Sequence, residues 1–538
     1  MIHSIAQAVF SALLSAAALP NELFLQGLWP LGFVAVAPLY RALKRQGSYA
    51  SAMGVGMAFG ASHHALTSYW LFFYKDFAFW TLGSTTLAYA FIYGLAATMA
   101  RFILRAGPKT YRPYLFALGW VCLEFFKSIG FLGYPWGLLP YSLTSLPVFL
   151  QIADITGVYG LSFLLAAASA LLEESSPWLP GASGSFRGPR RLPDLAFLSL
   201  LLAATLLYGL HSFNKDIPET KRFRAALVQQ NTDPWISGEI PALESNLLLA
   251  RQAHEESLGA GKTPADLVIF SETSLRRPYA DFLSWFETNP KKEPLRPFLA
   301  ETDSYLLTGA PIILDWKEYS ASNSAILVSP QGVQLQDYAK MHPVPFAEAI
   351  PLWEYEWFRS FMRETIGLDS GWVMGERIVI FSFSPKSLPG RTVSFATPIC
   401  FEDAFADLCR AYVREGAELL INLTNDSWSR KESAQTQHWA IARFRAIENR
   451  ITLVRSTNAG VSCVVDPWGR NIVEFPQFTA YSSTVDIPVY KSHLPTIYSA
   501  WGDWFAILCA LLFASALVIL ASRRKHEHTG ISRLDALP

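Results

Sequence analysis

The stretch Thr392-Val-Ser-Phe-Ala-Thr-Pro-Ile-Cys400 is rich in β-branched and aromatic residues and ends at a cysteine. Such a run predicts a β-strand, and the residues from Ala404 to Glu415 predict a helix soon after it. A side chain at a strand-to-helix corner is exposed, and the backbone N–H groups there are free to bind an oxyanion. Cys400 is therefore a candidate nucleophile. The alternative is a buried cysteine that packs as a small hydrophobe, which is the more usual case.

The surrounding block, residues 215–500, alternates strand-like and helix-like segments. The strand-like runs are Ala225–Val228, Asp266–Phe270, Ser304–Thr308, Ser324–Val328, Ile378–Phe383, Thr392–Thr397, Glu418–Leu423, Thr452–Arg455 and Ser462–Val465. The helix-like stretches are Pro241–Leu258, Ala404–Glu415 and Ala434–Asn449. Strands that alternate with helices indicate a layered α/β domain.

Two charged residues stand at the ends of other predicted strands. Glu272 ends the run Asp266-Leu-Val-Ile-Phe-Ser-Glu272, and Lys340 follows Asp337-Tyr-Ala after a strand and turn. Because the carboxyl ends of strands in an α/β sheet converge on one crevice, these two side chains can meet Cys400 there. Each of them taken alone is more simply interpreted as a surface charge at a strand end.

A thiol benefits from such neighbours. Its unperturbed pKa is about 8.5, so only a few per cent is thiolate at neutral pH. A carboxylate can accept the thiol proton during attack, and an ammonium can stabilise both a thiolate and an oxyanion.

The chain as a whole is apolar, and residues 1–214 and 501–521 are the most apolar parts. Over the whole chain, 16% of the residues are charged, against about 25% in soluble domains, and the mean hydropathy is +0.22. A transmembrane helix needs about 20 predominantly apolar residues. About eight segments qualify: 3–20, 27–43, 50–73, 78–100, 112–129, 155–172, 194–211 and 502–521. The sequence therefore predicts transmembrane helices over 1–214, a soluble block over 215–500, an eighth helix over 501–525 and a tail over 526–538.

Lysine and arginine are unevenly distributed among the short loops, which predicts the orientation in a membrane. One side carries Arg41, Lys44, Arg45, Arg101, Arg105, Lys109, Arg112, Arg187, Arg190, Arg191, Arg523, Arg524, Lys525 and Arg533. The opposite short loops offer Lys75 and Lys127. Both termini are therefore predicted to be cytoplasmic, and block 215–500 is predicted to lie on the outer face.

Composition also argues against several classes of protein. The 44 basic and 44 acidic residues cancel, so nothing indicates nucleic-acid binding. The five cysteines have no CxxC spacing, which argues against a disulfide framework or a zinc site. We therefore expect no metal and no cofactor.

Three segments resemble the motifs of the carbon–nitrogen hydrolase (nitrilase) superfamily, which uses Glu, Lys and Cys in that chain order. They are Ser271-Glu272-Thr273, Tyr338-Ala339-Lys340-Met341-His342 and Ile399-Cys400-Phe401-Glu402. The resemblance implies an αββα nitrilase-like fold for the soluble block. It also implies that Glu272 is the base, Lys340 the oxyanion stabiliser and Cys400 the nucleophile.

The chain as a whole resembles the apolipoprotein N-acyltransferase family, with Gly133-Tyr134-Pro135-Trp136 and Lys340–Glu348 among the distinctive stretches. The resemblance implies acyl transfer from a phospholipid, through a cysteine thioester, to the α-amino group of a diacylglyceryl-cysteine on an apolipoprotein. It implies a multi-pass protein of the bacterial cytoplasmic membrane. The alternative is a membrane-anchored amidase that hydrolyses carbon–nitrogen bonds.

The same resemblance assigns supporting residues. Glu348 and Glu402 match further active-site glutamates, Phe401 stands where a tyrosine is usual, and Trp235 is a candidate for an active-site tryptophan. Asn425 either shapes the site or belongs to a simple turn, and Trp428 is either a lipid-facing loop residue or core filler. His438, beside Trp439 on a predicted helix, is interpreted as a structural histidine.

Overall fold

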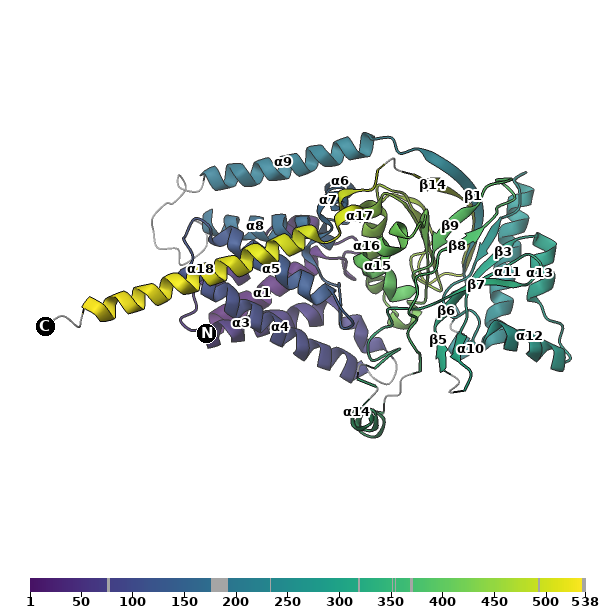
Figure 1. The fold of residues 1–538 in the computed structure, drawn as a ribbon, viewed down its shortest axis with the longest axis horizontal. Coiled ribbons are helices and arrows are strands. Elements are labelled where there is room, and N and C mark those ends of the chain that lie inside the picture. Colours follow the sequence, from purple (N-terminus) through teal and green to yellow (C-terminus); the bar gives the residue numbers. More distant parts are fainter. Residues whose placement is uncertain are drawn as a thin grey trace. The chain divides into compact units, whose positions relative to one another are not determined.

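The computed structural model describes residues 1–74, 78–175, 192–232, 234–317, 320–350, 352–353, 355–367, 371–491 and 494–534. The chain divides into two compact units (Figure 1). The first comprises Met1–Ile129, Gly133–Lys215 and Ala500–Pro538, and the second comprises Gly130–Leu132 and Asp216–Ser499. Every residue predicted for the site belongs to the second unit.

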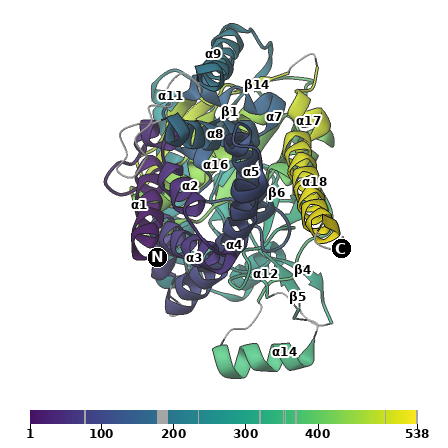
Figure 2. The same ribbon diagram turned by 90° about the vertical axis from the view of Figure 1, so that its left-hand side faces the viewer.

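The first unit is helical. Its helices are α1 (Ile2–Ala18), α2 (Ala37–Lys44), α3 (Tyr49–Thr67), α4 (Ala78–Ala106), α5 (Arg112–Ser128), α6 (Pro147–Leu150), α7 (Ala153–Thr156), α8 (Tyr159–Ser175), α9 (Leu192–Asn214) and α18 (Trp504–Leu534). Helix α3 packs against α1 and α4, and α5 packs against α4, α8 and α18 (Figure 2). The short helix α17 (Ile497–Trp501) contains the point where the chain returns from the second unit to the first.

Three helices among the described residues are long and apolar enough to cross a membrane: Phe79–Ala106, Leu192–Asn214 and Trp504–Arg524. A fourth candidate is the broken pair Pro147–Thr156 and Tyr159–Ser175, which is bent by 118°. Helix α1 is also apolar but has 17 residues. The apolar segments predicted around the soluble block are therefore mainly helical.

The predicted count of eight transmembrane helices is not confirmed. The second predicted segment, 27–43, forms a 3₁₀ helix at Trp29–Phe33 and then the eight-residue helix α2. At about 1.5 Å per residue, α2 is about 12 Å long, far less than the ~30 Å hydrocarbon core. The 3₁₀ helix and α2 each have a proline in their first turn. Because proline has no backbone N–H, it is tolerated at the start of a helix but interrupts a helix that would continue through it.

The second unit contains two six-stranded sheets. The first sheet has the strand order β14-β1-β2-β3-β6-β7, and its β1, β2 and β3 run parallel. Its strands are β1 (Glu219–Gln229), β2 (Leu267–Ile269), β3 (Tyr305–Gly309), β6 (Ser324–Val328), β7 (Gln334–Ala339) and β14 (Tyr481–Tyr490). A separate hairpin joins β4 (Ile312–Asp315) to β5 (Ser320–Ser322).

The second sheet has the order β13-β12-β11-β10-β9-β8, with β9, β10 and β11 parallel. Its strands are β8 (Phe381–Phe383), β9 (Val393–Ala396), β10 (Leu419–Thr424), β11 (Thr452–Thr457), β12 (Cys463–Val465) and β13 (Asn471–Glu474). The helices of the unit are α10 (Pro234–Ser237), α11 (Glu239–Gly259), α12 (Tyr279–Thr288), α13 (Leu295–Thr302), α14 (Glu356–Phe361), α15 (Ala406–Arg414) and α16 (Glu432–Asn449).

The alternation of side-chain directions along β1 shows how the layers of the second unit pack. Phe223, Ala225 and Leu227 are buried in one apolar cluster with the second sheet, whereas Ala226 and Val228 are buried in another with helices α11 to α13. Successive strand residues point to opposite faces, so β1 is covered on both sides. Helices α15 and α16 cover the other face of the second sheet (Figure 1). The layers are helix, sheet, sheet and helix.

Candidate active site

Cys400 lies four residues after β9, at the first position of the 3₁₀ helix η7 (Cys400–Ala404). Its φ is +49°, in the left-handed region that non-glycine residues seldom adopt. The Nδ2 amide of Asn422, on β10, donates to the carbonyls of Pro398 (3.1 Å) and Cys400 (3.2 Å). The neighbouring strand therefore holds a strained turn that presents a partly exposed thiol.

Glu272 and Lys340 come from the other sheet. Glu272 lies three residues after β2, and Lys340 directly follows β7. The ammonium of Lys340 lies 3.5 Å from Oε1 of Glu272 and 2.7 Å from Oε2 of Glu348. Lys340 and Glu272 are buried, and their charges act on the thiol of Cys400. The structure thus brings the three residues together from the facing ends of two sheets rather than from one crevice.

These groups shift one another's protonation. Burial raises the pKa of the Cys400 thiol, the Glu272 carboxylate raises it further, and Lys340 opposes the rise. Burial also raises the pKa of Glu272, against the effect of Lys340. Burial alone lowers the pKa of Lys340, but the carboxylates of Glu348 and Glu272 raise it above its usual value. These shifts favour a neutral Cys400 thiol beside a charged Lys340 ammonium.

Glu272 is held by two donors besides Lys340. The Nδ2 amide of Asn323 donates to Oε1 of Glu272 (2.7 Å) and to Oε1 of Glu348 (2.9 Å). The backbone N–H of Asn425 donates to the other oxygen of Glu272 (2.9 Å). The carbonyl of Asn323 also accepts the backbone N–H of Lys340 (2.9 Å). Asn323 thus contacts Glu272, Glu348 and Lys340.

Glu402 accepts hydrogen bonds from both sides of the site. Its Oε1 accepts the backbone N–H groups of Met341 (2.8 Å) and His342 (2.9 Å) and the hydroxyl of Tyr338 (2.8 Å). Its Oε2 accepts the N–H of Ile399 (2.7 Å). Burial raises the pKa of Glu402 to about 7. The carboxylate therefore joins the segment that carries Lys340 to the turn that carries Cys400.

The remaining predicted residues fall in three places. Phe401 is buried and meets Phe405 edge to face, with ring centroids 4.9 Å apart. Asn425 shapes the site through its backbone N–H, as described above. Trp428 lies in a short 3₁₀ helix, Ser427–Ser429, and is half-buried. Trp235 lies in α10, and its side chain is outside the described residues.

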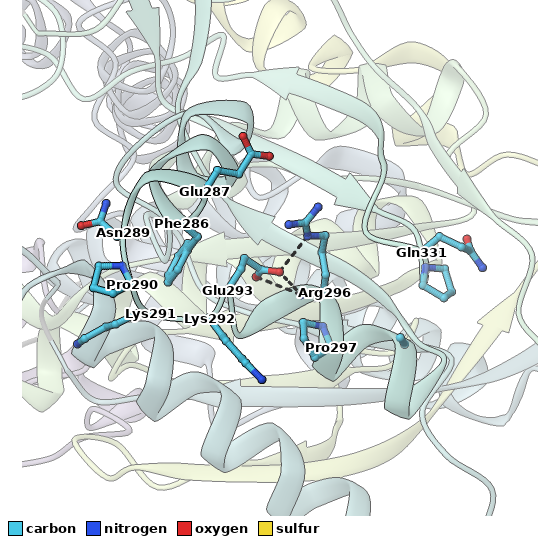
Figure 3. A pocket seen from close by; sticks show the side chains of 12 residues that line it. Phe286, Glu287, Asn289, Pro290, Lys291, Lys292, Glu293, Arg296, Pro297 and Gln331 are labelled. Carbon is cyan, nitrogen blue, oxygen red and sulfur yellow. Dashed lines mark hydrogen bonds and ion pairs between the residues drawn. The ribbon is translucent and has the colours of Figure 1, made fainter.

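A metal-binding group and a surface hollow are two other features that could mark a functional site. Over the described ranges, no three His, Cys, Asp or Glu side chains are grouped so that they could hold a metal ion. A surface hollow lies between the end of α12 and the start of α13, where Glu293 pairs with Arg296 (Figure 3). None of the predicted site residues lines this hollow.

The fold is that of a carbon–nitrogen hydrolase domain: residues 224–491 match the family described as carbon-nitrogen hydrolase. Residues 11–171 match the N-terminal domain of apolipoprotein N-acyltransferase. The chain belongs to the apolipoprotein N-acyltransferase family.

Individual relatives span nearly the whole chain. Apolipoprotein N-acyltransferase 2 of Treponema denticola is 38% identical over 96% of this chain and 97% of its own length. Apolipoprotein N-acyltransferase of Borreliella burgdorferi is 30% identical over 94% of both chains. A solved structure, Nit3 of Saccharomyces cerevisiae from the nitrilase superfamily, is 18% identical with a TM-score of 0.35 and covers 51% of this chain and 92% of that one.

Proposed function

We propose that this protein transfers an acyl chain from a membrane phospholipid, through a thioester on Cys400, to the α-amino group of the diacylglyceryl-cysteine of an apolipoprotein. Relatives along almost the entire chain carry the name of this activity. The observation that carries the proposal is the buried group of Glu272 and Lys340, whose charges act on a single partly exposed thiol.

In the first half-reaction, Sγ of Cys400 attacks the ester carbonyl carbon of the phospholipid while Glu272 accepts the thiol proton. Lys340 stabilises the oxyanion, as a fixed donor does in other acyl-transfer sites. The carbon–oxygen bond then breaks, Glu272 returns the proton to the leaving oxygen, and a lysophospholipid departs. The acyl chain remains on sulfur as a thioester.

In the second half-reaction, the neutral α-amino group of the lipoprotein attacks the thioester carbon. Glu272 accepts a proton from the nitrogen, the carbon–sulfur bond breaks, and the proton passes to the departing thiolate. An amide is formed and the thiol is restored. Such a scheme is ping-pong, so an acyl-enzyme accumulates when the acceptor is missing.

A membrane setting suits both substrates. Each CH₂ group moved from apolar surroundings into water costs about 0.8 kcal/mol, so extracting a 16-carbon chain costs on the order of 10 kcal/mol. A site at the bilayer surface avoids that cost. The segment after Glu348 carries several exposed apolar side chains around α14, which lies away from both sheets (Figure 2). They are Leu352, Tyr355, Trp357 and Phe361.

We further propose the topology that the positive charges predict. Residues 1–214 and 501–525 form the membrane-embedded part, and 215–500 form the catalytic domain on the outer face of the bacterial cytoplasmic membrane. Residues 526–538 and the N-terminus are cytoplasmic. This orientation places the thiol on the side where lipoproteins receive their acyl chains.

Intact-protein mass spectrometry tests the function. Mixing the purified protein with phospholipid is expected to add one acyl mass, which hydroxylamine removes. Adding a diacylated lipopeptide is expected to return the protein to its original mass and to produce N-acylated peptide. A membrane-anchored amidase would instead release ammonia from small amides and leave the lipopeptide unmodified, and that result contradicts the proposal.

Asn323 gives a second prediction. Asn323→Leu removes the donor shared by Glu272 and Glu348 while keeping a side chain of similar size. Lys340 still contacts both oxygens, but losing a hydrogen bond to a charged group costs about 1.5–3 kcal/mol, so acyl-adduct formation should slow by about 10- to 100-fold. The rate is measured by mass spectrometry after rapid mixing with phospholipid. Asn289→Leu, at the end of α12, is the control and should retain the wild-type rate.

A further inference from the structure

His438 lies between two aspartates. On α16, its Nε2 is 2.8 Å from Oδ1 of Asp403, and its Nδ1 is 2.9 Å from Oδ2 of Asp426. A carboxylate is an acceptor, so each ring nitrogen must carry a proton to bond its partner. An imidazole with two N–H groups is an imidazolium. With a carboxylate at each ring nitrogen, this geometry favours a cationic ring.

The charges around this ring are balanced only if it is cationic. Arg455, on β11, pairs with Asp403 and lies 3.6 Å from Oδ2 of Asp426. All four side chains are buried. With an imidazolium, two cations face two carboxylates. With a neutral ring, one buried negative charge would be left uncompensated, which is strongly unfavourable.

Each aspartate is attached to a different part of the site. Asp403 lies in the 3₁₀ helix that begins at Cys400. Asp426 directly follows Asn425, whose N–H holds an oxygen of Glu272. The imidazolium thus joins the turn that presents the nucleophile to the loop that orients the base. It does so through its contacts with Asp403 and Asp426.

We propose that His438 is a positioning residue: an imidazolium that fixes the separation between the Cys400 turn and the Glu272-orienting loop. The inference rests on the proposed function. The ring acts through Asp403 and Asp426, so its loss changes how often thiol and base are aligned. We therefore expect it to affect the rate of the chemical step and to leave phospholipid binding unchanged.

The pH dependence follows from the groups that face the ring, namely Asp403, Asp426 and Arg455. Burial lowers the pKa of His438, but the two carboxylates outweigh burial and raise it to about 9. Because folding raises the pKa of His438, the protonated ring contributes stability to the folded state. This contribution is fully present below about pH 6.5, the pKa of an unfolded histidine, and is lost as the pH rises through about 9. The protonated ring therefore joins the Cys400 turn to the Glu272-orienting loop across the neutral pH range.

The first test observes the ring directly in the full-length protein. With ¹⁵N-labelled histidine, the His438 signals, assigned by their loss in His438→Gln, should show both nitrogens protonated from pH 6 to 8. A neutral His438 ring at pH 8 would overturn the proposal.

The second test uses a charge-balanced pair of variants. His438→Gln and Asp426→Asn each unbalance the cluster and should slow acyl-adduct formation by about 30- to 100-fold, with KM for phospholipid within about twofold. The double variant restores neutrality and should be faster than either single variant. His254→Gln, the same exchange on α11, is the control and should keep the wild-type rate.

The outcomes separate this inference from the proposed function. If the wild-type protein forms no acyl adduct, the proposed function is contradicted. Normal adduct formation by the wild type together with an unchanged rate in His438→Gln would overturn the positioning role. A double variant slower than both single variants would also contradict it, because a charge-balanced linkage could not then be the cause.

Discussion

Cys400→Ala is expected to abolish acyl transfer and to leave the protein folded. Alanine has a Cβ at the same position, so it meets the same positive φ as cysteine and adds no backbone strain. It removes the atom that forms the thioester, and loss of a nucleophile costs on the order of 10⁴-fold or more in other acyl-transfer enzymes. No acyl mass should appear after incubation with phospholipid, and no lipopeptide should be acylated.

Two comparisons make this result specific. Cys409→Ala, on α15, changes a buried cysteine that is expected only to pack, and the variant should still form the adduct. Cys400→Ser keeps the shape but offers a hydroxyl, a much weaker nucleophile at neutral pH, and should show at most a trace of adduct. Undiminished turnover in Cys400→Ala would show that another group carries the acyl chain.

Much of the second unit could be predicted because its buried strands are apolar runs. The run at Thr392–Thr397 corresponds to β9 and the run at Glu418–Leu423 to β10, both buried between neighbours in the second sheet. The edge strands β7, β13 and β14 lack such a run, whereas the edge strand β8 falls within the predicted run Ile378–Phe383. In β7, exposed and half-buried residues alternate, and β13 shows the same pattern, so neither forms a continuous apolar run. Strand β14 is half-buried over much of its length.

The residues that hold the site were harder to predict than the residues that react. Glu272 and Lys340 stand out as charges after predicted strands. Asn323 lies among serines between two short strands, and nothing in its neighbourhood marks a residue that bridges two glutamates 51 and 25 positions away. Only its two contacts in the folded chain reveal that role.

The contacts of Glu402 could not be predicted from its motif. Its place two residues after Cys400 implies an active-site carboxylate. In the structure it has four donors, two of which are backbone N–H groups immediately after Lys340. These bonds depend on two sheets facing each other, whereas the sequence argument placed the strand ends in one crevice. A contact between sheets leaves no signature in the local pattern of either strand.

The second large effect is expected for Glu272→Gln. Glutamine has the same shape but keeps one of the two acceptor oxygens, so either the Nδ2 amide of Asn323 or the backbone N–H of Asn425 loses its acceptor. This costs about 1–3 kcal/mol, and the fold should survive. It cannot accept the thiol proton, and loss of a general base typically costs about 10²- to 10⁴-fold. Because the pKa of the Cys400 thiol lies well above neutral, little thiolate is present to compensate. Acyl-adduct formation at pH 7 should therefore fall by about three orders of magnitude.

The pH profile distinguishes loss of a base from general damage. Burial raises the pKa of Glu272. As the pH is lowered, the wild-type rate should therefore begin to fall at a pH above the ordinary range of carboxyl pKa values. In Glu272→Gln this acid limb should vanish, and the residual rate should instead rise with pH as the thiol ionises. Glu287→Gln, on α12, is the control and should reproduce the wild-type profile. If the acid limb persists unchanged in Glu272→Gln, a different group accepts the proton and Glu272 is not the base.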